Sequence, residues 1–200
     1  MRTLMLAASR LRKSGKVITE EDLLAGSMLL GWLGLLPTSE VGTASEIAAA
    51  CDITAGTVIN QNTQWMGFTH KGNVLYIPQK PIRNNVSWNQ LNDAGLIFGK
   101  TVSINGVSYT ARVFSETENE WLDLMRRVSS GGISSGRWAS YSDAVLVLSG
   151  DLPGQNSMTQ QHSGTTYLGR GSQGVNFSEN LSKAGATTFR GWRPVLQLIG

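Results

Sequence analysis

Few side chains in this 200-residue sequence have the type and spacing that catalysis requires. The histidines are His70 and His162, and Cys51 is the single cysteine. A Cys–His pair, or a Ser-His-Asp triad around His162, would be needed for nucleophilic catalysis. Cys51 ends the Ala-rich segment 45–51, where a free cysteine usually behaves as a small buried hydrophobe. A triad is defined by geometry rather than by composition, and no G-x-S-x-G motif or other local signature supports one here. We therefore expect that the protein is not an enzyme.

Metal and cofactor sites are not indicated either. A single cysteine excludes Cys₄ and Cys₂His₂ zinc sites, which need four ligands. Residues 169–174 (GRGSQG) match G-x-G-x-x-G, but a dinucleotide site also needs a helix after the motif, and VNFSEN does not start one. The acidic residues of 116–123 surround a predicted helix N-terminus, where the helix dipole favours them. We therefore expect no metal and no cofactor.

The composition is unusual for its shortage of charge. Only 16% of the residues are charged, against about a quarter in typical globular proteins. The content of 40% hydrophobic residues, with six tryptophans, excludes a disordered chain. A surface so poor in charge is covered by uncharged polar side chains or by another protein, which favours a subunit of a larger assembly.

Positive charge is concentrated in one place. The formal net charge is +3, and the only dense basic segment lies within residues 1–16. It is either a solvated terminus or an arm that docks on an acidic neighbour. Because the other basic residues are scattered rather than gathered on one face, we expect no binding of nucleic acid.

Residues 1–60 are predicted to form a small, mainly helical segment. The run Leu23–Leu36 (LLAGSMLLGWLGLL) has 14 residues, too few for the roughly 20 that span a bilayer, so we expect no membrane insertion. It is interpreted as a buried or interface helix that Thr19 caps and Pro37 ends. A helix that is apolar all round must be covered by the rest of the chain or by a partner. The candidate assembly interface consists of its largest apolar residues: Leu29, Leu30, Trp32, Leu33, Leu35 and Leu36.

Residues 61–200 are predicted to form an α+β domain. Alternating apolar residues indicate a hairpin over 65–78 and a second over 101–114, the latter around Asn105-Gly106, a preferred type I′ turn. Short helices are expected after Ser87, which has a capping-box partner in Gln90, and over 119–128. A buried strand is expected over 144–148 and a terminal strand over 195–199.

The stretch 150–188 is predicted to be a long, polar, irregular loop. Loops of that length inside a domain are usually functional. Its candidate recognition residues combine adaptable polar groups with one rigid aromatic ring: Gln155, Asn156, Gln160, Gln161, His162, Tyr167 and Arg170. Four tryptophans of the domain are expected to serve its core instead: Trp88, Trp121, Trp138 and Trp192.

The motifs PIRNNVSW (81–88) and GWRPVL (191–196) resemble those of a domain of bacteriophage virion proteins, of the tail-fibre or appendage type. The last motif is also similar to the terminal strand of C-type-lectin-like domains. The resemblance spans about two thirds of the chain, from Trp65 on. It implies a lectin-like fold of antiparallel strands, two short helices and a long irregular loop, with Arg193 holding the loop and a last strand that pairs with the first. The EPN, QPD and WND motifs of calcium-dependent lectins are absent, so no calcium–sugar site is implied.

The resemblance implies a virion structural protein, a tail or capsid appendage subunit. Residues 1–60 would dock to the particle, and the domain 61–200 would face the host surface. The expected partners are other virion proteins (tail, portal or capsid), further copies in a trimer or ring, and a host-surface glycan or protein. The expected location is the virion, made in the host cytoplasm. Two alternatives remain: a cementing protein without host contact, and, least favoured because the domain is poor in acids, a glycan-active enzyme.

Overall fold

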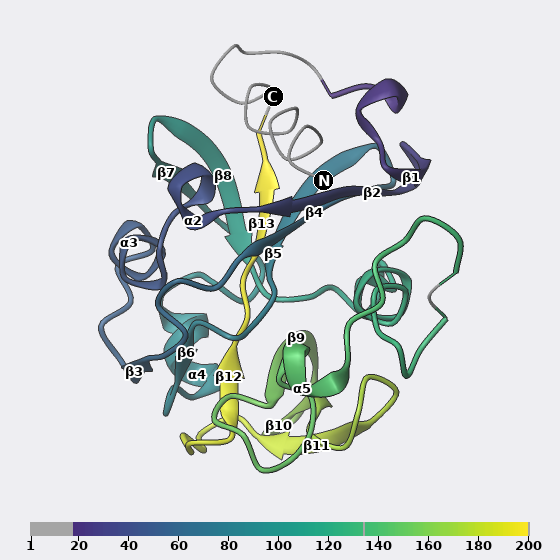
Figure 1. The fold of residues 1–200 in the computed structure, drawn as a ribbon. Coiled ribbons are helices and arrows are strands. Elements are labelled where there is room, and N and C mark those ends of the chain that lie inside the picture. Colours follow the sequence, from purple (N-terminus) through teal and green to yellow (C-terminus); the bar gives the residue numbers. More distant parts are fainter. Residues whose placement is uncertain (1–17, 134, 200) are drawn as a thin grey trace.

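The computed structural model describes residues 18–133 and 135–199, which form an α+β fold built on two β-sheets (Figure 1). This confirms the α+β part of the predicted fold class. The basic stretch within residues 1–16 lies outside the described residues. In Figure 1 one sheet lies above the other, and the yellow C-terminal strands run from the lower sheet into the upper one.

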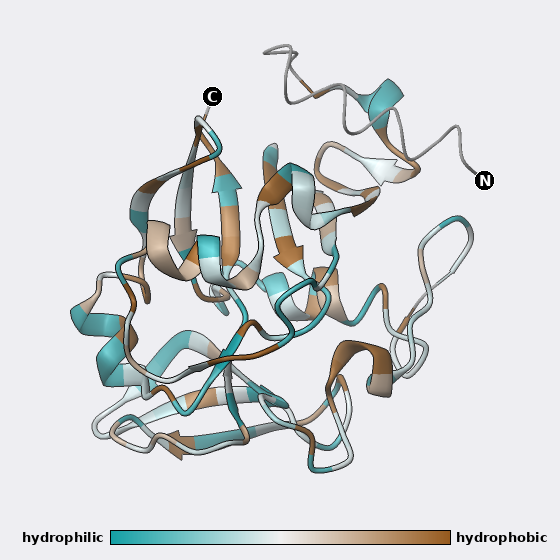
Figure 2. Ribbon diagram, turned by 60° about the vertical axis from the view of Figure 1, so that its left-hand side comes forward, coloured by the Kyte–Doolittle hydropathy of each residue, from teal (hydrophilic) through white to brown (hydrophobic). Residues whose placement is uncertain are grey.

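The upper sheet has seven strands, and every neighbouring pair is antiparallel. Its central strands are buried along most of their length, with one core cluster on each face of the sheet. Figure 2 shows brown, apolar segments within these strands. In sheet order they are β1 (Ala25–Ser27), β2 (Leu30–Leu36), β4 (Trp65–His70), β5 (Asn73–Pro78), β13 (Val195–Leu198), β8 (Val107–Arg112) and β7 (Lys100–Ile104).

The lower sheet has six strands and is antiparallel except where β12 runs parallel to β9. In sheet order they are β11 (Ser178–Ser182), β10 (Thr166–Gly171), β9 (Asn156–Ser163), β12 (Arg190–Trp192), β6 (Arg83–Asn84) and β3 (Thr57–Val58).

The helices are short, and side-chain caps start several of them. Ser87 accepts a hydrogen bond from the Gln90 backbone N–H, and the Gln90 side chain accepts one from the Ser87 N–H, which confirms the predicted capping box. The predicted helix over 119–128 is also present, as one wide turn. The helices are η1 (Glu20–Asp22), α2 (Thr38–Val41), α3 (Ala44–Ala50), α4 (Trp88–Asp93), η2 (Trp121–Met125) and α5 (Asp143–Leu146).

The helix predicted over Leu23–Leu36 is wrong, because this run forms the hairpin of β1 and β2. A continuous apolar run has no periodicity that separates a strand from a helix. Gly31 favours the strand, because a Cβ at this position would lie 2.3 Å from the Thr69 hydroxyl of β4. The missing side chain of Gly31 thus allows β2 to pack closely against β4.

The proposed assembly interface is therefore mostly internal. Trp32, Leu33 and Leu36 are buried within the chain, on the two faces of β2. Leu30 and Leu35 are half-buried. These five side chains pack against the rest of the chain rather than forming a bare helix. Leu29, at the tip of the β1–β2 hairpin, stays 71% exposed.

The strand predicted over 144–148 is also wrong. Ser142 accepts a hydrogen bond from the Val145 N–H (3.4 Å) and starts α5, which ends at Val147 in the left-handed conformation (φ 53°). The run is short enough for a local N-cap to decide between strand and helix. Leu146 and Leu148 are buried, so the predicted burial of these two side chains is confirmed.

The long irregular loop predicted over 150–188 is instead a meander of β9, β10 and β11. Its strands are rich in Ser, Asn, Gln and Gly and contain few of the β-branched and aromatic residues that indicate a strand in a sequence. A two-residue turn with Gly164 at φ 51° joins β9 to β10. The G-x-G-x-x-G stretch lies at the end of β10 and in the turn after it, with no helix behind it.

The described part of 1–60 belongs to the same body as the rest. β2 lies between β1 and β4, and β3 pairs with β6. Ile47 of α3 packs in one core cluster with Tyr109 and Trp192. Each sheet therefore contains strands from both sides of residue 60.

The two motifs that carry the resemblance meet at the centre of the fold. β6 and β12 pair in the lower sheet, with Trp192 opposite Arg83, and β5 and β13 pair in the upper sheet, with Leu196 opposite Tyr76. The segment from β5 to β6 and the segment from β12 to β13 thus run side by side from one sheet to the other. We call this place the crossing. β13 pairs with β5 and β8 rather than with Trp65–His70, which corrects the implied pairing of the last strand with the first.

Arg193 lies at this crossing, with only 1% of its surface exposed. All its partners are neutral. Its Nε donates to Ser157 Oγ at 3.2 Å, and its terminal nitrogens donate to the carbonyl oxygens of Pro78 (3.2 Å), Gln79 (2.6 Å) and Leu146. Burial lowers its pKa from the usual range. Arg193 thus ties α5 and β9 to the crossing, the structural position that the resemblance implies.

The four tryptophans expected in the core lie in or against it. Trp88, Trp121 and Trp192 are buried, and Trp138 is half-buried against the second core cluster. The indole N–H of Trp121 donates to the Val175 carbonyl oxygen at 2.7 Å.

Candidate functional site

The candidate site is a cleft of about 350 Å³ to which both sheets contribute. We call it the polar cleft, because polar side chains form most of its wall. β4, β5, β8 and β13 of the upper sheet line it together with β9 of the lower sheet and the segment that leads into η2. Its lining residues are His70, Lys71, Asn73, Leu75, Phe98, Arg112, Ser115, Glu118, Glu120, Gln160 and Gln197.

A buried ion pair lies at one wall of the polar cleft. Arg112 ends β8 and reaches the carboxylate of Glu120 with both terminal nitrogens, at 2.7 and 2.5 Å. The side chains are only 10% and 2% exposed. The backbone N–H of Ser115 donates to the same carboxylate at 2.8 Å. This bidentate geometry fixes both side chains.

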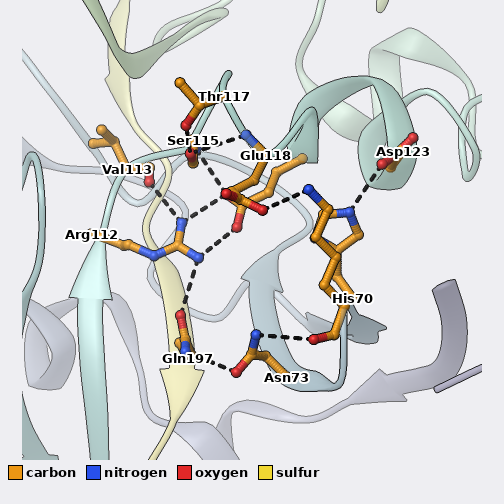
Figure 3. Close-up of polar contacts among 11 residues, drawn as sticks. His70, Asn73, Arg112, Val113, Ser115, Thr117, Glu118, Asp123 and Gln197 are labelled. Carbon is orange, nitrogen blue, oxygen red and sulfur yellow. Dashed lines mark hydrogen bonds and ion pairs between the residues drawn. The ribbon is translucent and has the colours of Figure 1, made fainter. Parts of the chain in front are cut away.

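Two amides continue the network from this pair toward solvent. Arg112 donates to Gln197 Oε1 at 3.3 Å, and Gln197 Nε2 donates to Asn73 Oδ1 at 3.1 Å. Figure 3 shows this chain of contacts, with Asn73, Arg112 and Gln197 reaching one another from three neighbouring strands. The amides present both donors and acceptors to the cleft.

The remaining charges of the cleft are paired as well. His70 Nε2 lies 3.0 Å from Asp123 Oδ2, and the Lys71 ammonium lies 2.6 Å from Glu118 Oε2. The hydrogen bond from Lys71 lowers the pKa of Glu118. Since Lys71 and Arg112 each have a carboxylate partner, the polar cleft offers many directional polar groups while these charges cancel in pairs.

One rim of the cleft is aromatic. Phe98 is 61% exposed, and its ring lies 6.0 Å from the His162 ring and 6.5 Å from the Trp88 ring, both edge to face. The Lys183 ammonium lies 4.5 Å from the centre of the Trp88 ring. An exposed ring held by such a cluster is a platform on which a flat apolar face can stack.

The structure separates the predicted recognition residues into two groups. Gln155, Asn156 and Tyr167 are buried and do not reach the surface, so they cannot contact a partner there. Arg170 forms an ion pair with Glu116 at 2.5 Å, with both side chains largely buried. These four predictions are corrected, because the stretch is a sheet with an inner face rather than a loop.

The other three predicted residues lie near the cleft. Gln160 lines it, and Gln161 and His162 follow on β9 as exposed residues. The sequence missed the polar groups from distant strands, above all Arg112, Glu120 and Gln197. The available signal is the charged residue in the otherwise strand-like VSYTARVF, whereas the helix dipole alone accounts for Glu120 in the sequence.

Cys51 is buried, and burial raises its pKa to about 12. A thiol in that state is a poor nucleophile. The described residues contain no group of three or more His, Cys, Asp or Glu side chains placed to hold a metal ion. Within the same ranges, no helix has the length and apolar character that crossing a bilayer requires.

Comparison with models of known protein families, with curated proteins and with solved structures found no match for this chain.

Proposed function

We propose that the protein is a structural subunit of a bacteriophage particle, a tail or capsid appendage, whose lectin-like region contacts the host surface through the polar cleft. The resemblance of the motifs 81–88 and 191–196 supports the assignment. The two motifs pair with each other through β6 and β12, and β13 of the second motif lines the cleft beside β5. The virion is then the place where the protein acts.

The observation that carries the recognition role is the composition of the cleft wall. Its charges are paired internally, and Phe98 offers an exposed ring. The amides of Asn73 and Gln197 each keep a second N–H and a second oxygen lone pair beyond the hydrogen bonds that they make within the chain. Ligands rich in hydroxyl groups fit such a wall, since each hydroxyl both donates and accepts. The cleft carboxylates Glu118 and Glu120 are each held by a cation, which supports binding rather than hydrolysis of a glycan.

Binding of neutral oligosaccharides by the purified full chain tests this proposal. We expect N73A and Q197A each to weaken binding by about three- to tenfold, because each variant removes about one hydrogen bond worth 0.5–1.5 kcal/mol. The control is N180A, which removes an exposed amide on β11, outside the cleft. Equal affinities of all four proteins would place binding elsewhere, and no binding of any oligosaccharide would contradict the recognition role.

Leu29 favours the second candidate function, a cementing protein that binds only other virion proteins or further copies of itself. At 71% it is the most exposed large apolar side chain in the described ranges, and it lies at the tip of the β1–β2 hairpin. Burying a leucine contributes about 1.5–3 kcal/mol. We expect a trimer or ring for the wild type by light scattering and a smaller species for L29K. A wild type that stays monomeric would contradict assembly through this tip.

A further inference from the structure

A second group of side chains adjoins the polar cleft and differs from it in charge. We call it the cationic patch and define it as Trp88, Phe98, His162 and Lys183. It is continuous with the cleft because Phe98 belongs to both, and Gln160 of the cleft precedes His162 by two residues on β9. A ligand that fills the cleft and stacks on Phe98 therefore also reaches the patch.

The hydrogen bond between Lys183 and His162 fixes the donors of the patch. Lys183 Nζ lies 3.0 Å from His162 Nδ1. Because an ammonium only donates, Nδ1 accepts, and the imidazole proton then lies on Nε2. The histidine is exposed, so its Nε2–H is a donor available to a ligand.

Lys183 itself carries a charge that the fold does not neutralise. None of the ion pairs among residues 18–133 and 135–199 includes it. Its other contact is the face of the Trp88 ring, at 4.5 Å from the ring centre. The ring holds the ammonium in place through its quadrupole and leaves its positive charge unpaired.

We propose that the cationic patch is a subsite for the carboxylate of an acidic saccharide, with the sugar ring on Phe98 and the neutral part of the glycan in the polar cleft. This inference rests on the proposed function and deepens it, since it selects among glycans. The Lys183 ammonium is the donor for the carboxylate. The His162 Nε2–H points away from Lys183, on the opposite side of the imidazole ring from Nδ1, and is a donor for a hydroxyl group of the saccharide. The paired charges of the cleft give no such preference, so selectivity for acid resides in the patch.

The experiment titrates the isotope-labelled full chain with methyl β-glucuronide and with methyl β-glucoside, two probes that differ only in the carboxylate, and follows backbone amide shifts by NMR. We expect the glucuronide to bind at least about fivefold more tightly, with shifts at Lys183 and at His162 in addition to the cleft. The advantage should shrink when salt is raised, because the patch is at the surface.

The variant K183M should bring the affinity for the glucuronide down to that for the glucoside, whereas H162A should weaken the binding of both probes, because the Nε2–H contacts a hydroxyl group that they share. The matched control is K80M, which removes an ammonium at the β5–β6 crossing and should keep the preference. The dispersed amide spectrum of each variant shows that it folds.

Two results overturn the inference, and they are distinguishable. Equal affinity of the wild type for the two probes, with shifts that map to the cleft, would refute the acidic subsite and leave the proposed function standing. The absence of shifts with both probes would refute the subsite together with the proposed function. A preference that K183M keeps would place the selection elsewhere.

Discussion

The variant R193M is expected to lower the free energy of unfolding by at least about 3 kcal/mol. The methionine fills much of the same space, but it leaves the carbonyl oxygens of Pro78, Gln79 and Leu146 without their donor inside the core. Each buried acceptor without a partner costs about 1–3 kcal/mol. Urea unfolding of the two proteins measures the difference, provided that the slope of the transition is unchanged.

The matched control for this prediction is R137M, which removes an exposed arginine from the loop before Trp138. We expect it to change stability by no more than about 0.5 kcal/mol. R193K should fall between the two, because an ammonium reaches fewer of the acceptors than the planar guanidinium does. A stability of R193M equal to that of R137M would show that the crossing does not depend on Arg193.

The second large effect is expected at the buried pair of the cleft. E120L should destabilise the protein by about 3–5 kcal/mol, because it leaves Arg112 charged and buried without its partner. The double variant R112M/E120L should be more stable than E120L, since replacing both members of a buried pair by apolar side chains is often close to neutral. Urea unfolding of both variants and of R112M gives the coupling energy.

Loss of the buried pair should also weaken ligand binding, independently of its effect on stability. Gln197 loses its donor when Arg112 is replaced, so R112M/E120L should bind oligosaccharides more weakly even where it is stable. A double variant less stable than E120L would contradict the account of the pair as a buried, mutually dependent unit.

Local signals predicted part of this fold correctly. The cap of Ser87 and Gln90 and the turn of Asn105 and Gly106, with φ of 52° and 79°, depend on residues within a few positions of one another. Such patterns determine structure through the nearest hydrogen bonds. They were recognisable without knowledge of the rest of the chain.

The failures have a common physical origin in long-range contacts. The run over Leu23–Leu36 forms a hairpin whose second strand, β2, pairs with β4. Because β4 lies outside the run, no pattern within the run indicates this pairing. The polar strand β9 is held by Arg193 from the far end of the sequence and by Trp88, whose indole N–H donates to the Thr159 carbonyl oxygen. In each case a distant partner overrides the weak local preference.

The candidate site, like the fold, is predictable from the sequence only in part. Gln160, the one residue of β9 that lines the cleft, lies within the predicted recognition stretch, as does the exposed His162 beside it. The buried wall joins Arg112 to Gln197 across 85 positions of sequence, and only the pairing of β8 with β13 brings these two side chains together. A site assembled from several distant strands in this way has no characteristic residue spacing by which it could be recognised in the sequence.

The central claim is that this chain is a virion subunit whose cleft faces the host. Electron microscopy of intact particles from the phage or prophage that encodes it, labelled with an antibody raised against the purified chain, tests the claim most directly. The account predicts label on an external appendage of intact particles. Label that is found only after the particles are disrupted would favour the cementing role, and no label on intact or disrupted particles would contradict the account.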